Sequence, residues 1–188
     1  MLLDSALAMN LNIDQERFVY GAKGHLYAGS GNKEEVQKLL DTLNMPAKQM
    51  GVILSWNVPI ELKMELYHLQ GNIDKAITEY DKLEQRGRLF NLNLKATLYG
   101  VARDWENVIS TASEMQASFL RGYLLTDFRD QNYPRSFYIR GKAYEEMGKP
   151  ELAIENYEAL LDLWKDADEE IPERRDTIKR LTALKQES

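Results

Sequence analysis

The sequence predicts an all-α chain of about four helical hairpins, followed by one further helix at the C-terminal end. Apolar residues recur at the three- and four-residue spacing of amphipathic helices along most of the 188 residues. Four stretches also share one motif in phase. No stretch alternates apolar and polar residues as a strand does, and no Asn-Gly or Asp-Gly pair marks a β-hairpin. We therefore expect helices packed on helices.

The first hairpin illustrates how each element is inferred. Gly31 can take the left-handed conformation that ends a helix, and Asn32 can cap the helix that follows. The next helix places four apolar residues on one face at helical spacing: Val36, Leu39, Leu40 and Leu43. Gly-Asn recurs at Gly71 in the second hairpin. The expected array covers 1–188, with hairpins at 14–44, 57–87, 89–119 and 134–165 and a capping helix at 171–186.

A tyrosine precedes each hairpin turn by four residues, which sets the register of the repeats. The tyrosines are Tyr27, Tyr67, Tyr99 and Tyr144, and the turn residues are Gly31, Gly71, Arg103 and Gly148. A small or branched apolar residue follows each turn residue by five positions: Val36, Ala76, Val108 and Ala153. Four copies in phase predict that one structural unit is repeated along most of the chain.

The fourth copy resembles the tetratricopeptide repeat (TPR) most closely. The family pattern is W-x₂-L-G-x₂-Y followed by A-x₃-F, and this copy has Phe137-x₂-Arg140-Gly141-x₂-Tyr144 followed by Ala153-x₃-Tyr157. Arg140 departs from the leucine of the pattern, and the three earlier copies match more loosely. The resemblance implies a right-handed α-solenoid that binds a protein or peptide in a concave groove, without catalysis and without a cofactor.

The same pattern assigns packing roles to its small and aromatic residues. Gly24, Ala96 and Gly141 are expected where the two helices of one hairpin cross, because a small residue lets two backbones approach closely. The repeat tyrosines are expected to fill the space between hairpins. Tyr144 would then be a buried residue whose replacement by alanine costs about 3–5 kcal/mol.

In this family the first helix of each hairpin lines the groove, and the repeat register therefore implies the groove residues. The partner-binding residues are expected to be His25, Glu61, Glu65, His68, Asn93, Thr97, Tyr138 and Lys142. Gly21, Ala28, Gly100 and Glu145 fall on the same strip. Because Glu61 and Glu65 would repel a carboxylate, a ligand with a basic or aromatic segment is expected.

Composition argues against most other classes of function. The absence of cysteine excludes disulfides and thiol chemistry, and a net charge of −6 disfavours nucleic acid as a partner. No apolar run approaches the ~20 residues needed to span a membrane. Glu61, Glu65 and His68 share a helix face, but a carboxylate-bridged metal site would need a second Glu-x-x-His. We expect no metal, no cofactor and no enzymatic activity.

Two alternatives remain open. Residues 1–12 resemble the tail of an earlier repeat, so the chain is expected to be a domain of a larger protein, which we expect to be bacterial and cytoplasmic. The first alternative is structural self-association, in which an uncovered N-terminal end forms a homo-oligomer. A regulatory sensor would instead hold a small ligand near the insertion at 120–133, where Tyr123, Phe128 and Tyr133 cluster.

Overall fold

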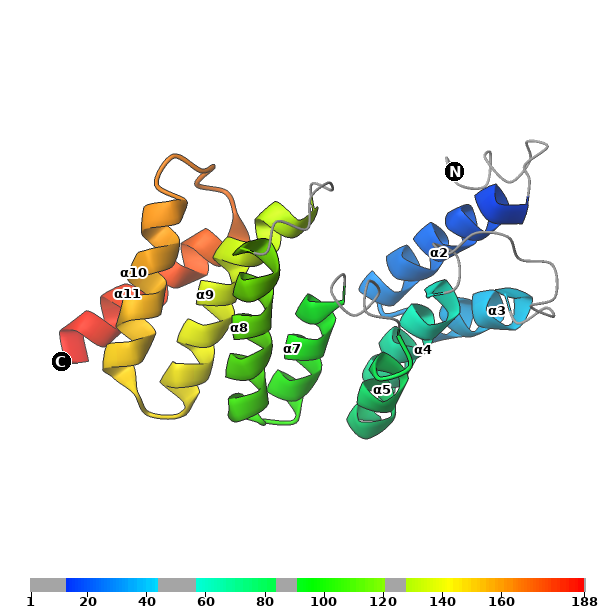
Figure 1. Cartoon of the computed structure of the whole chain (residues 1–188), viewed down its shortest axis with the longest axis horizontal. Helices are drawn as coiled ribbons and strands as arrows, with labels where there is room; N and C mark the ends of the chain where they lie inside the picture. Colours follow the sequence, from blue (N-terminus) through cyan, green and yellow to red (C-terminus); the bar gives the residue numbers. More distant parts are fainter. Residues whose placement is uncertain (1–12, 44–56, 84–90, 121–127, 188) are drawn as a thin grey trace. The chain divides into compact units, whose positions relative to one another are not determined.

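The computed structural model describes residues 13–43, 57–83, 91–120 and 128–187, and these ranges are helical with no strand. The helices are α2 (Ile13–Gly29), α3 (Lys33–Leu43), α4 (Val58–Leu69), α5 (Ile73–Tyr80), α7 (Leu92–Val101), α8 (Trp105–Leu120), α9 (Phe128–Glu146), α10 (Pro150–Leu163) and α11 (Pro172–Glu187) (Figure 1). Successive helices pair as hairpins, with α11 following the last pair. The predicted all-α class of helical hairpins is confirmed.

The chain divides into two compact units, Met1–Arg88 and Leu89–Ser188, called here the first and the second unit. Each contains two hairpins among its described residues, and α11 belongs to the second. The single array over 1–188 stays a prediction. Residues 1–12, expected to be the tail of an earlier repeat, and Tyr123, expected near a small ligand, lie outside the described residues.

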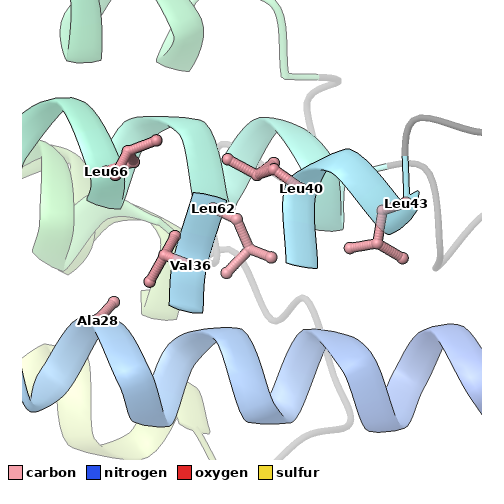
Figure 2. Packing of buried hydrophobic residues seen from close by; sticks show 6 residues of the cluster. All are labelled: Ala28, Val36, Leu40, Leu43, Leu62 and Leu66. Carbon is pink, nitrogen blue, oxygen red and sulfur yellow. The ribbon is translucent and has the colours of Figure 1, made fainter. Parts of the chain in front are cut away.

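Helices α2, α3 and α4 enclose the core of the first unit. The cluster of buried side chains consists of Ala28, Val36, Leu40, Leu43, Leu62 and Leu66 (Figure 2). The predicted apolar face of α3 is buried along its length, as expected. Gly24 needs correction: a Cβ at this position would overlap Leu62 of α4. Its small size therefore allows close packing with the next hairpin and not with α3 of its own hairpin.

In the second unit, α9 contacts α8 on one side and α10 on the other, and α11 packs on both α10 and α9. A Cβ at Gly141 would overlap the ring of Tyr157, which is fully buried on α10. The expected close crossing within the fourth hairpin is therefore present. Tyr144, in contrast, is only half-buried. Helix α9 begins at Phe128, several residues before the hairpin start expected at 134.

The four hairpin turns have the same backbone geometry. Gly31, Gly71, Arg103 and Gly148 all have positive φ, from 58° to 76°. In each turn the N–H of the following residue donates to the carbonyl of the repeat tyrosine: Tyr27, Tyr67, Tyr99 or Tyr144, at 2.8–2.9 Å. This is the Schellman geometry that ends a helix and satisfies its last carbonyls. The side chains of Asn32 and Asp104 cap the helices that follow, accepting from Glu35 N at 3.3 Å and Asn107 N at 3.2 Å.

Arg103 is the one described turn residue with positive φ that is not glycine. Left-handed backbone costs an L-residue about 1–2 kcal/mol, whereas glycine adopts it freely but loses more entropy on folding. We therefore expect Arg103→Gly to raise the free energy of unfolding by about 0.5–1 kcal/mol in urea titrations. Arg175→Gly, an exposed control on the right-handed α11, should lower it by about 1 kcal/mol. A loss of stability in Arg103→Gly would contradict the assignment of strain to this turn.

Candidate functional site

A pocket of about 440 Å³ lies in the second unit among α7, α8, α9 and the first turn of α11. Of the six groove-strip residues predicted in this unit, all but Glu145 line it: Asn93, Thr97, Gly100, Tyr138 and Lys142. Asn93 and Thr97 are four residues apart on α7, and Tyr138 and Lys142 are four apart on α9, so each pair shares one helix face. The two first helices of the hairpins therefore bring the predicted residues to one place.

The floor of this pocket is apolar and built from small side chains. Ala96, Val108 and Ala143 are buried beneath it. Gly100 lies beside the indole of Trp105, where an added Cβ would be 3.9 Å from the ring, an ordinary van der Waals contact. Small residues at the floor leave the volume that a partner side chain could occupy.

Polar groups surround the opening. The ammonium of Lys142 lies 5.3 Å from the centre of the Tyr138 ring, a cation–π distance. The Tyr138 hydroxyl donates to Asp176 Oδ2 at 2.7 Å, and Arg135 Nε pairs with Glu173 Oε1 at 3.1 Å. Burial, together with the hydrogen bond to Asp176, raises the pKa of Tyr138, so its hydroxyl stays a neutral donor.

Three residues expected on the groove strip are used elsewhere. Gly21 is buried, where a Cβ would meet Val58, and Ala28 belongs to the core of the first unit. The Glu145 carboxylate accepts from Tyr157 Oη at 2.7 Å and pairs with Arg180 Nη1 at 3.0 Å. Gly21 and Ala28 are buried, so their assignment to the groove surface is wrong, whereas Glu145 joins α9 to α10 and α11 and does not line the pocket.

Sequence reasoning missed residues that the second helix of a hairpin, the first part of α9 and α11 contribute to the pocket. Trp105 and Val108 come from α8, Arg135 from the first part of α9, and Glu173 from α11. One signal for Trp105 was present in the sequence. A large aromatic residue directly after the Arg103-Asp104 turn has no role in capping a helix, which leaves packing or binding to explain it.

In the first unit, the structure joins three of the predicted groove residues. His25 Nδ1 lies 2.9 Å from Glu65 Oε1, and His25 Nε2 lies 3.7 Å from Glu61 Oε2. The histidine comes from α2 and both glutamates from α4. His68, expected beside these glutamates, is half-buried further along α4, so that His25 is the histidine in contact with both carboxylates.

The two carboxylates change the charge of His25. Interactions with Glu61 and Glu65, partly opposed by burial, raise the pKa of His25 to about 10. The imidazole is therefore charged at neutral pH and offsets one of the two negative charges. Because each ring nitrogen faces a different carboxylate, the arrangement is an ion-pair cluster. Among the described residues, no group of three or more His, Asp or Glu side chains is arranged to hold a metal ion.

This cluster predicts a pH dependence of stability. The folded-state pKa of His25 lies above its ordinary value of 6.5, so the stabilisation is complete below pH 6.5 and is lost as the pH rises toward 10. The side chain of His25 is 42% exposed, and we expect a loss below about 1 kcal/mol. Urea unfolding from pH 6 to 10 should show this loss in wild type and not in His25→Gln. His68→Gln is the matched control and should retain it; an equal slope in His25→Gln would contradict the assignment.

The fold is that of a helical-repeat protein of the α-solenoid class. Residues 134–163 match the tetratricopeptide repeat family. A crystal structure of TPR-like repeats from a protein of Podosopora anserina, assigned as a kinesin light chain, is similar with a TM-score of 0.62. The two are 18% identical, and the match covers 89% of this chain and 84% of the other. No curated protein matches the chain.

At this identity the structural similarity concerns the fold alone. Tetratricopeptide repeats generally mediate protein–protein interactions and are typically non-catalytic. In the parts of the chain that the structure describes, no helix is long and apolar enough to cross a membrane.

Proposed function

We propose that this chain is a non-catalytic protein–protein interaction module that binds a peptide or protein segment in the pocket of the second unit. The observation that carries the proposal is the convergence of Asn93, Thr97, Tyr138 and Lys142 on one pocket. These residues follow from the repeat register and the family's groove helix, and the convergence of two i, i+4 pairs from two helices on one concave site supports a binding site there.

The chemistry of the pocket favours an extended segment that inserts one apolar or aromatic side chain. Its floor of small residues lies beside the rings of Trp105 and Tyr138, which offer contact area at low entropic cost. The Asn93 amide can both donate to and accept from a peptide group. The aromatic part of the ligand expectation is thus supported. The argument for a basic segment is weaker, because the charge of His25 offsets one of the two negative charges of Glu61 and Glu65.

Selection of peptides from a displayed library on the full chain, followed by calorimetric titration, tests this proposal. Thr97 is exposed on α7. Thr97→Arg should cover the pocket and lower the affinity for a selected peptide by at least about tenfold. Thr78→Arg is the matched control. Both threonines are exposed and donate to the carbonyl four residues earlier, Thr78 to Asp74 at 2.8 Å and Thr97 to Asn93 at 2.9 Å. Equal binding by wild type and Thr97→Arg would rule out this pocket.

A further inference from the structure

We propose that α11 forms a wall of the binding pocket, and that Asp176, held by Arg180, is the positioning residue that fixes Tyr138 in it. This inference deepens the proposed function and rests on it. A capping helix would be expected only to cover the apolar end of the last hairpin. Here α11 also places polar side chains at the pocket.

Helix α11 contacts pocket residues of α9 at two points. Glu173, in its first turn, lines the pocket and pairs with Arg135 of α9 at 3.1 Å. Asp176 accepts a hydrogen bond from the hydroxyl of Tyr138, also on α9, with an O–O distance of 2.7 Å. Both contacts hold pocket residues of α9, so the position of α11 determines where these two side chains lie.

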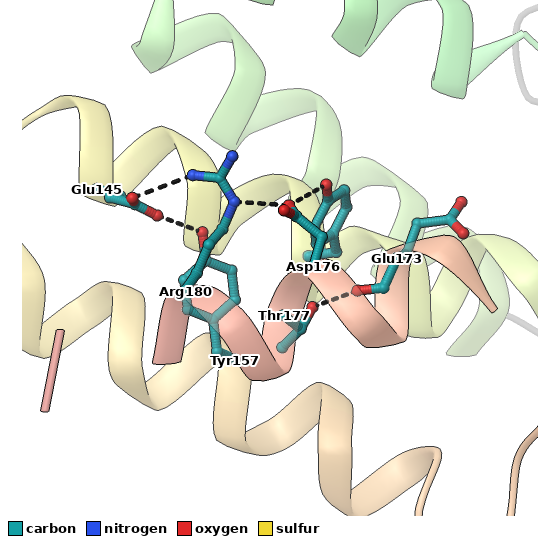
Figure 3. A network of polar contacts seen from close by, with 7 residues as sticks. Glu145, Tyr157, Glu173, Asp176, Thr177 and Arg180 are labelled. Carbon is teal, nitrogen blue, oxygen red and sulfur yellow. Dashed lines mark hydrogen bonds and ion pairs between the residues drawn. The ribbon is translucent and has the colours of Figure 1, made fainter. Parts of the chain in front are cut away.

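Asp176 is itself fixed by Arg180, which sits one helical turn later on α11. Arg180 Nε lies 2.6 Å from Asp176 Oδ2, and its Nη1 lies 3.0 Å from Glu145 Oε1 on α9 (Figure 3). One guanidinium therefore joins two carboxylates from two helices. Burial of Asp176 opposes ionisation, but the hydrogen bonds from Arg180 and Tyr138 outweigh it and lower the pKa of Asp176.

At its other end, the network of Tyr138, Asp176, Arg180 and Glu145 contacts a buried aromatic ring. Glu145 Oε2 accepts a hydrogen bond from the Tyr157 hydroxyl at 2.7 Å, and Tyr157 has no exposed surface. Its ring packs against Gly141 of α9. The chain of contacts therefore runs from the pocket wall at Tyr138, through α11, to the core of the fourth hairpin.

The consequence is a preorganised wall. With its hydroxyl bound to Asp176, the Tyr138 ring cannot change rotamer without losing a charge-assisted hydrogen bond. Its face is then presented to Lys142, 5.3 Å away. A ligand that contacts this ring does not have to order it, which increases affinity without adding any contact.

Affinity measurements on a double-mutant cycle test the positioning role. Tyr138→Phe and Asp176→Ala should each lower the affinity for a peptide selected on the wild-type chain by roughly three- to tenfold. This is the loss expected when one side chain is left unordered. The double variant should be no weaker than either single variant, because both remove the same contact. Additive losses would overturn the inference, since they would mean that the Tyr138 hydroxyl and Asp176 act separately.

The matched control is another contact between α11 and the fourth hairpin. Lys185 of α11 pairs with Glu158 of α10 at 2.6 Å, and neither residue lines the pocket. Glu158→Gln should leave peptide affinity unchanged. An equal loss in Glu158→Gln and Asp176→Ala would show that only the docking of α11 matters, and would overturn the role of Asp176.

A measurement without ligand separates failure of this inference from failure of the proposed function. Side-chain scalar couplings of Tyr138 in the labelled full chain should report one χ1 rotamer in wild type and averaged rotamers in Asp176→Ala. An unaltered single rotamer in Asp176→Ala overturns the positioning role even where peptides bind. If no peptide binds wild type, the proposed function fails, and with it the binding role of α11.

Discussion

Replacement of Tyr157 by alanine is expected to lower the free energy of unfolding by about 3–5 kcal/mol, the usual cost of emptying a buried aromatic position. Tyr157 has no exposed surface and its ring lies against Gly141, which has no side chain to fill the space. Its hydroxyl also donates to Glu145. Urea unfolding of the full chain, with hydrogen exchange of the α9 and α10 amides, measures the loss and locates it.

Two companion variants sharpen this result. Tyr157→Phe keeps the ring and removes one hydrogen bond, so about 1 kcal/mol is expected. Tyr144→Ala removes a half-buried ring and should cost on the order of 1–2 kcal/mol, well below the 3–5 kcal/mol that the repeat pattern alone suggests for it. A greater loss at Tyr144 than at Tyr157 would contradict the packing of the fourth hairpin.

Leu62→Ala should lower the free energy of unfolding by about 2–5 kcal/mol, and the loss should fall in the first unit. Leu62 has no exposed surface and belongs to the cluster shared by α2, α3 and α4. It also packs against Gly24, which has no side chain that could move into the cavity left behind. Hydrogen exchange should therefore become faster in these three helices.

The control for this prediction is a second leucine of the first unit. Leu26, on α2, is 65% exposed, and its replacement by alanine should change the free energy of unfolding by less than about 0.5 kcal/mol. Similar costs for Leu62→Ala and Leu26→Ala would mean that the core of the first unit is not where the structure places it.

The turns and the register of the repeats could be predicted because their signals are local. A left-handed residue must follow each first helix for the chain to reverse, and glycine supplies it at three of the four turns. Arg103 carries no such signal by itself. Its place was inferred from the spacing to Tyr99 and Val108, and its positive φ confirms the inference.

Packing between helices could not be predicted in the same way. The pattern places an aromatic residue on each helix of the fourth hairpin, Tyr144 and Tyr157, but only Tyr157 packs on Gly141 and is fully enclosed. Gly24 likewise meets Leu62 of the next hairpin and not α3. Which partner a residue meets depends on how helices distant in sequence cross, and spacing within one helix does not specify that crossing.

The residues of the candidate site differ in the same way in how far the sequence predicts them. Asn93, Thr97, Tyr138 and Lys142 could be predicted because i, i+4 pairs on the first helices must share a face. The ion pair of Glu145 with Arg180 could not be predicted, because it depends on where α11 docks. The pairing of His25 with two glutamates of α4 likewise depends on contact between separate hairpins.

Mapping of a bound peptide by amide chemical shifts of the ¹⁵N-labelled full chain tests the central claim most directly. If the pocket of the second unit is the binding site, the largest shifts will fall at residues 93–100 of α7 and 138–142 of α9, and Thr97→Arg will abolish them. Shifts confined to the first unit, or to the faces of α7 and α9 that do not line the pocket, would contradict it.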